Sequence, residues 1–222
     1  MALVDQVRRD IETFLQDSQE LFFNERDLQM HLAVFLRASG ARYDDVDVEY
    51  YVPRTELEGY IWQSELRLDL VVRKGDEYLP IELKYKTSDV TVDIPRFGEP
   101  LEDCQVMKYQ GAQDLGMYDF WKDVRRIELI RQRFSNVKNG LALFLTNDKF
   151  YVNGPRATSN NAKLSLKAGT HSKEKYWQNS QSRCAKDNPG FTVERDYAIS
   201  WNTAEAYAQQ QKIEQYYCIV TI

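Results

Sequence analysis

Apolar residues recur at helical spacing in two segments near the start of the chain. In residues 3–19 they return every three or four positions, which predicts an amphipathic helix. Residues 25–39 repeat the pattern, with Asn24 as the predicted N-cap and two acids in the first turn, where the helix dipole favours them. Gly40 is expected to end this second helix.

The next part of the chain changes to short, alternating or continuous apolar runs, which predict strands. These runs cover residues 46–53, 65–73, 77–85 and 140–147, and residues 149–153 are predicted to pair with the last of them across an Asn-Asp turn. Between the third and fourth runs, residues 117–134 form a strongly amphipathic pattern that predicts a long helix.

The remaining segments are assigned from turn residues and from periodicity. Residues 87–103 predict a loop, and a helix is expected from Gln105 with a break at Gly111 and Gly116. Residues 153–190 predict a long polar loop or a partly ordered excursion. The end of the chain predicts a strand (197–201), a helix (203–215) and a final strand (216–222). The pattern predicts a single α/β domain, residues 1–222, with a mixed central sheet flanked by helices.

Composition restricts the class of protein. The chain is 43% hydrophobic and 28% charged, so it can bury a core and fold unaided. It has no apolar run long enough to span a bilayer and no secretory signal, and its three cysteines are far apart, which predicts a cytoplasmic protein with reduced thiols and no membrane partner. With two histidines and no phosphate-binding glycine motif, any metal is expected to be a hard cation held by carboxylates.

Charge is distributed unevenly. The net charge is −5, yet residues 153–187 hold seven Lys or Arg against two acids, a local balance of +5. This segment is the predicted contact with a polyanion, through Lys163, Lys167, Lys173 and Lys175, with Tyr176 and Trp177 available for base stacking. A disordered surface loop is the alternative, and the arginines of residues 125–133 are predicted to form a solvated face.

The stretch LRLDLVVRKGDEYLPIELKYK, residues 66–86, predicts a hairpin with a Gly75-Asp76 turn. This turn sets Asp69 opposite Glu82, with Lys84 on the same face. Two opposed carboxylates repel unless a cation lies between them, and a divalent metal with a nearby ammonium is an arrangement suited to phosphodiester hydrolysis. The alternative is a charged outer face on which Arg67 and Lys84 neutralise the acids.

With Asp69 followed by Glu82-Leu83-Lys84, the chain resembles the PD-(D/E)xK phosphodiesterase superfamily, although Leu68 stands where the motif has proline. Segments after the motif also resemble uncharacterised bacterial proteins with this core. The predicted order of elements in residues 20–146 is similar to the αβββαβ core of the superfamily, with residues 153–190 as an insertion and 191–222 as a C-terminal strand–helix–strand. The resemblance implies a restriction-endonuclease-like fold.

The resemblance also implies site residues and an activity. Asp69 and Glu82 would hold Mg²⁺ or Mn²⁺, with Glu25 as a further acid, and Lys84 would position the attacking water. The sequence QVMKY is similar to the QxxxY element of one branch, through Gln105 and Tyr109, with Gln110 or Gln113 as substitutes.

The expected activity is nuclease action, on DNA rather than RNA, by a protein that could act as a homodimer. The alternatives are a non-catalytic nucleic-acid-binding or interaction protein on the same fold, and an α/β domain whose hairpin acids are only surface charges.

Overall fold

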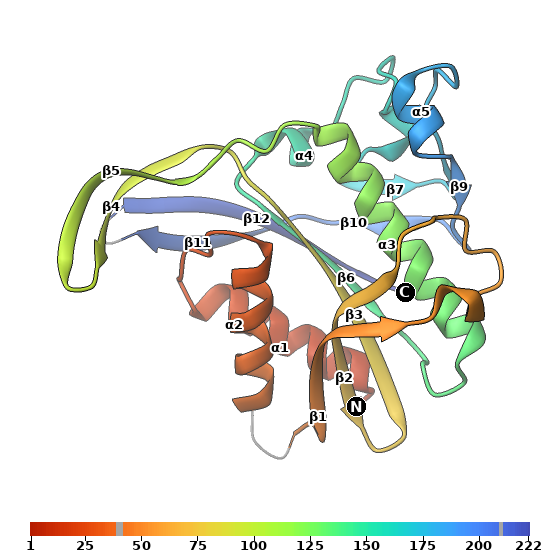
Figure 1. Cartoon of the computed structure of the whole chain (residues 1–222), viewed down its shortest axis with the longest axis horizontal. Coiled ribbons are helices and arrows are strands. Elements are labelled where there is room, and N and C mark those ends of the chain that lie inside the picture. Colours follow the sequence, from red (N-terminus) through yellow and green to blue (C-terminus); the bar gives the residue numbers. More distant parts are fainter. Residues whose placement is uncertain (39–41, 209–210) are drawn as a thin grey trace.

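A six-strand mixed sheet forms the centre of the computed structural model, which describes residues 1–38, 42–208 and 211–222 (Figure 1). The strand order is β1 (Asp45–Val52), β2 (Leu66–Lys74), β3 (Glu77–Lys86), β6 (Leu141–Thr146), β12 (Gln211–Thr221) and β11 (Asn202–Ala208). β3 and β6 run parallel and the other neighbours antiparallel. The mixed α/β class is therefore confirmed.

Helices cover both faces of the sheet. Helices α1 (Leu3–Asp17) and α2 (Glu25–Ala38) pack on one face, and α3 (Gln113–Arg133) packs on the other. The N–H of Asp27 donates to Asn24 Oδ1 at 2.9 Å, which confirms the predicted N-cap. The predicted stop at Gly40 lies outside the described residues. No helix in the described part of the chain is long and apolar enough to cross a membrane.

Shorter elements complete the chain. They are η1 (Arg54–Glu56), β4 (Val90–Arg96), β5 (Glu99–Met107), α4 (Lys149–Asn153), η2 (Ala162–Leu164), β7 (Gly169–His171), β8 (Glu174–Lys175), α5 (Arg183–Asp187), β9 (Phe191–Thr192) and β10 (Tyr197–Ile199). The predicted strand at 149–153 is wrong, because Asp148 caps a short helix there by accepting the N–H of Phe150.

Two other segments, predicted as a loop and a helix, are strands in which buried and exposed residues alternate. Residues 87–103 are not a loop: β4 and β5 form a hairpin whose Val90 and Val92 are buried in the core. Likewise the predicted helix at 203–215 consists largely of β11 and the start of β12. Ala204 and Ala206 face the core of α1 and α2, so tertiary packing overrides the helix propensity of this Ala- and Gln-rich segment.

The register of the β2–β3 hairpin is as predicted. Pairs run from Lys74 with Glu77 to Leu70 with Ile81, where the ladder ends. Asp69 and Glu82 are the next residues along but do not pair, because β2 leaves β3 at this point.

The β1–β2 pair turns a corner where it separates from β3. Leu70 packs in the cluster under α1 and α2, whereas Leu68, two residues earlier, belongs to a separate cluster with Leu129 and Ile130 of α3. Alternate residues of a flat strand share a face, so the pair must twist sharply between them. Figure 1 shows the resulting bend in β1, and Glu49 at this level has a positive φ of 53°.

The polar excursion of residues 154–190 is packed against α3 and is mostly irregular. Leu164, Leu166 and Trp177 are buried with the aromatic residues of α3, and Trp177 stacks on Tyr118 with ring centroids 5.9 Å apart. Trp177 is therefore not available to stack on a base. The reading of this segment as a loose surface loop is also wrong, because its apolar residues belong to the core.

Lys175, predicted to contact phosphate, is 1% exposed and cannot do so. Its Nζ lies 3.5 Å from the ring centroid of Trp121 and donates to the carbonyl of Ser172 at 2.7 Å. Burial lowers the pKa of Lys175 to about 7, although Asp196 and Glu174 oppose the shift.

This burial predicts a pH-dependent stability. Between pH 7 and 10 the unfolded chain holds a proton on Lys175 that the folded chain lacks, so the free energy of unfolding should rise with pH. Urea unfolding of Lys175→Met, which retains the apolar stem, should show a stability advantage over the native chain. This advantage should be largest near pH 7 and should shrink by up to about 1.4 kcal/mol for each pH unit as the pH rises toward 10. The exposed neighbour Lys173→Met serves as control and should show a constant difference; parallel curves for Lys175→Met would contradict the account.

Candidate active site

Two carboxylates occupy the gap that β2 leaves beside β3. Asp69 Oδ2 accepts the backbone N–H of Leu83 at 2.6 Å, and Glu25 Oε2 accepts that of Tyr85 at 2.8 Å. The two N–H groups lie beyond the end of the β2–β3 ladder and would otherwise lack a strand partner. The acids therefore act in place of the missing strand.

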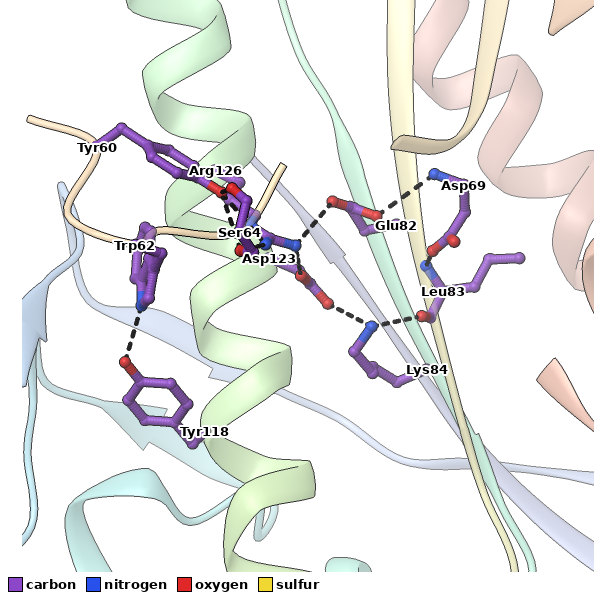
Figure 2. A network of polar contacts seen from close by, with 10 residues as sticks. All are labelled: Tyr60, Trp62, Ser64, Asp69, Glu82, Leu83, Lys84, Tyr118, Asp123 and Arg126. Atoms are coloured by element: carbon purple, nitrogen blue, oxygen red, sulfur yellow. Dashed lines mark hydrogen bonds and ion pairs between the residues drawn. The ribbon is translucent and has the colours of Figure 1, made fainter. Parts of the chain in front are cut away.

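Glu82 and Lys84 project from β3 toward α3, as the alternation of the strand predicts (Figure 2). Lys84 Nζ lies 2.8 Å from Asp123 Oδ2 and donates to the Leu83 carbonyl at 3.0 Å. Arg126 links the two acids, with its Nη1 3.1 Å from Asp123 Oδ1 and 3.9 Å from Glu82 Oε1. The side chains of Glu82 and Asp123 are each 3% exposed.

Asp69 does not join them as the flat hairpin predicted. Its carboxylate turns to Leu83, while its backbone N–H lies 3.4 Å from Glu82 Oε2 (Figure 2). The acids are neighbours, but the prediction that all three side chains share one face holds only for Glu82 and Lys84. The corner in β1–β2 is the physical reason for the difference.

The burial of these groups shifts their proton affinities. Burial raises the pKa of the Asp69 carboxyl to about 6, against the opposing charge of Lys84. Burial, followed by the charges of Asp123 and Asp69, raises the pKa of Glu82 well above its usual range. Burial alone lowers the pKa of Lys84, but Asp123 and the other carboxylates outweigh it and raise the pKa. Lys84 is therefore charged at neutral pH.

The net charge of the acids and bases at this site would favour a hard divalent cation, but their side chains are not arranged around one. Glu25, Asp69, Glu82 and Asp123 are four carboxylates, and Lys84 and Arg126 are two cations, so this group has a formal balance of −2. Glu82 Oε1 is buried without a hydrogen-bond partner among the described residues. Within the same ranges, no three His, Cys, Asp or Glu side chains are arranged to hold a metal ion. Asp69 and Glu82 are neighbouring acids of this group, linked by the Asp69 backbone N–H, which lies 3.4 Å from Glu82 Oε2.

A polar pocket of about 390 Å³ opens beside the acids on the α2 side. Glu25, Asp69 and Gln110 line it, together with Glu49, and Gln29 Nε2 bridges the Glu49 carboxylate (3.3 Å) and the Asp69 carbonyl (2.8 Å). We call it the acid pocket.

Of the predicted site residues, Glu25, Asp69 and Gln110 line the acid pocket, whereas Glu82 and Lys84 face α3 and do not. Gln105 is on strand β5 instead of the predicted helix, and its side chain donates to Asp89 Oδ1 at 3.0 Å. Tyr109 is 51% exposed and does not line the pocket, so only Gln110 of this segment does. Lys163, Lys167 and Lys173 are exposed on the excursion that packs against α3 and do not line the pocket either.

The sequence interpretation missed Asp123, Arg126 and Glu49. Asp123 lies three residues after Phe120 and four before Ile127, so it falls on the apolar stripe of α3, and this spacing could have shown its burial. Arg126 is 12% exposed, which corrects the prediction that it belongs to a solvated face. Nothing in the sequence pattern indicates the positive φ of Glu49.

Comparisons with known proteins identify no relative: no protein-family model, no curated protein and no solved structure matches the chain.

The buried network predicts an asymmetric response to substitution. Arg126→Met should cost about 3–5 kcal/mol of unfolding free energy, because the buried side chains of Asp123 and Glu82 would lose the cation that they share. Glu82→Gln in the same background should recover part of this loss, a coupling that a double-mutant cycle by urea unfolding measures.

Arg133→Met is the matched control on the same helix. Its guanidinium pairs with Glu56 at 2.7 Å with both side chains about half exposed, and such a pair contributes at most about 1 kcal/mol. If Arg126→Met costs no more than Arg133→Met, the network does not hold the buried acids.

Proposed function

We propose that this protein is a metal-dependent nuclease of the PD-(D/E)xK type, acting on DNA in preference to RNA, on a restriction-endonuclease-like version of the observed sheet. The observation that carries the proposal is the buried, partly unpaired carboxylate of Glu82, next to Asp69 and Lys84 where β2 leaves β3. The order α2, β1, β2, β3, α3, β6 supports it, since it is the order of the resembled core with the β4–β5 hairpin inserted.

Asp69 and Glu82 would hold Mg²⁺ or Mn²⁺, which prefer carboxylate oxygens. The metal, when bound, would lower the pKa of a bound water and offset the charge of the phosphodiester. The formal negative charge of the site favours such an ion, and burial, the main cause of the raised pKa values of both carboxyls, makes their ionised forms costly without a nearby cation.

Lys84 contributes positive charge. Asp123 holds its ammonium at 2.8 Å and keeps it protonated, so Lys84 would orient a water and stabilise charge on the phosphate and would not remove a proton. Glu25 accepts the Tyr85 N–H and lines the acid pocket, which suits contact with the ion through water more than direct binding.

The second candidate is a non-catalytic nucleic-acid-binding or interaction protein. One observation favours it: Asp69 and Glu25 each accept a backbone N–H of β3, a structural role that needs no metal. A cytoplasmic location and a homodimer stay predictions from the sequence.

Cleavage assays test the proposal directly. Single- and double-stranded DNA and RNA are incubated with the protein and Mg²⁺ or Mn²⁺. Asp69→Asn keeps an oxygen that can accept the Leu83 N–H, so it should fold. Lys84→Met keeps the apolar stem but leaves Arg126 as the cation beside Asp123, so circular dichroism must show that this variant folds before its rate is compared. Each should lower the rate of DNA cleavage at least about 100-fold. Asp69→Asn removes a carboxylate that would hold the metal, and Lys84→Met removes the ammonium that would stabilise charge on the reacting phosphate.

Matched controls lie at the far end of the same hairpin. Asp76→Asn and Lys74→Met change an exposed acid and an exposed lysine, and both should cleave at the native rate. Equal activity of Asp69→Asn and Asp76→Asn would contradict the assignment of Asp69 to the active site. A folded native protein that binds nucleic acid but cleaves none of the four substrates would favour the non-catalytic function.

A further inference from the structure

An apolar groove of about 460 Å³ lies on the other side of the β1–β2 corner from the acid pocket. The bent end of β1 contributes Tyr50 and Tyr51, β3 contributes Tyr78 and Pro80, and the chain after α3 contributes Phe134. Its volume is in the range of pockets that enclose small organic groups. Tyr50 and Tyr51 are 38% and 48% exposed, so their rings are accessible to a ligand.

Several polar groups at the groove have no hydrogen-bond partner among the described residues. The hydroxyls of Tyr50, Tyr51 and Tyr78 and the side-chain amide of Asn136 make no hydrogen bond to any other group in the described ranges. An apolar, aromatic surface with a few free donors and acceptors suits a flat heteroaromatic ring that has polar edges.

Residues of the groove are direct sequence neighbours of residues of the acid pocket on both β1 and β2. Tyr50 follows Glu49 of the acid pocket, and its strand partner Leu68 precedes Asp69. β1 is the edge strand of the sheet, so a polymer can pass around the corner without crossing a strand ladder.

Charge beside the groove suits an anionic polymer. The Arg67 guanidinium lies 5.4 Å from the ring centroid of Tyr51 and forms no ion pair in the described part of the chain. Arg133 lines the groove with its guanidinium 5.1 Å from the ring centroid of Phe134, and the same guanidinium pairs with Glu56 at 2.7 Å, so Arg67 is the unpaired cation of the two. An aromatic surface with flanking guanidinium groups is the combination that binds single-stranded nucleic acid without reading its sequence.

We propose that this groove binds one unstacked base of a single-stranded nucleic acid while an adjacent phosphate of the same strand reaches the acid pocket. The proposal deepens the nuclease function and rests on it for the identity of the polymer. The expected substrate of the site is therefore a nucleic acid with an unpaired base, such as a single strand, a strand end or a junction. A duplex keeps its bases stacked and cannot fill the groove.

The test compares two fluorescent strands with Ca²⁺ in place of Mg²⁺ or Mn²⁺, so that the carboxylates have a cation, and gel analysis confirms that the strands stay intact. One is a 12-nucleotide oligodeoxyadenylate, and the other is the same sugar–phosphate strand with every base replaced by hydrogen. By fluorescence anisotropy the native protein should bind the strand with bases at least about tenfold more tightly. In Tyr50→Ala/Tyr51→Ala the preference should fall to about twofold or less, with binding of the abasic strand unchanged.

Phe97→Ala removes an exposed aromatic ring outside the groove and should keep the full preference. Equal affinity of the native protein for both strands, no binding of either, or an unchanged preference in the double variant would overturn the proposal. A base preference that depends on Tyr50 and Tyr51, in a protein that cleaves nothing with Mg²⁺ or Mn²⁺, would refute the nuclease but not the groove. Cleavage without base preference would refute only the groove.

Discussion

The separation of β2 from β3 after the Leu70–Ile81 pair is the constraint on which the rest of the site depends. A sheet that splits leaves backbone N–H groups without acceptors, and each one buried without a partner costs about 1–3 kcal/mol. Here the carboxylates of Asp69 and Glu25 accept these bonds from β3. The fold therefore places two acids in the gap for a structural reason, and the same placement makes them available for chemistry.

Beside the gap, the buried charges are costly for stability, and this cost is one reason for proposing a function for them. Glu82, Asp123, Lys84 and Arg126 are nearly enclosed between the sheet and α3, where apolar residues of similar size would pack at lower cost. Strongly shifted pKa values of this kind concentrate at functional sites. Asp123 is central because it holds Lys84 and Arg126 at once, and so fixes the ammonium near the acids of β3.

The parts of the structure that depend on local sequence could be predicted, and those that depend on distant packing could not. The Gly75-Asp76 turn and the strand alternation set the hairpin register correctly. The direction of the Asp69 carboxylate follows from the corner in β1–β2, where packing against α3 replaces packing under α1 and α2. Similarly, Lys175 lies in a segment too polar to suggest burial, and Trp121, more than 50 residues earlier, encloses it. Ala204 and Ala206 form a strand because the sheet covers them, against their helix propensity.

The central claim is that Asp69 and Glu82 together hold a divalent metal ion at the split between β2 and β3. A crystal structure of the native protein grown with Mn²⁺, with anomalous diffraction, tests it most directly. The account predicts one anomalous peak within about 2.0–2.6 Å of a carboxylate oxygen of each residue, and no such peak in Asp69→Asn. A native crystal soaked in Mn²⁺ that shows Asp69 still bonded to the Leu83 N–H, Glu82 still facing Arg126 and no peak between them would contradict it.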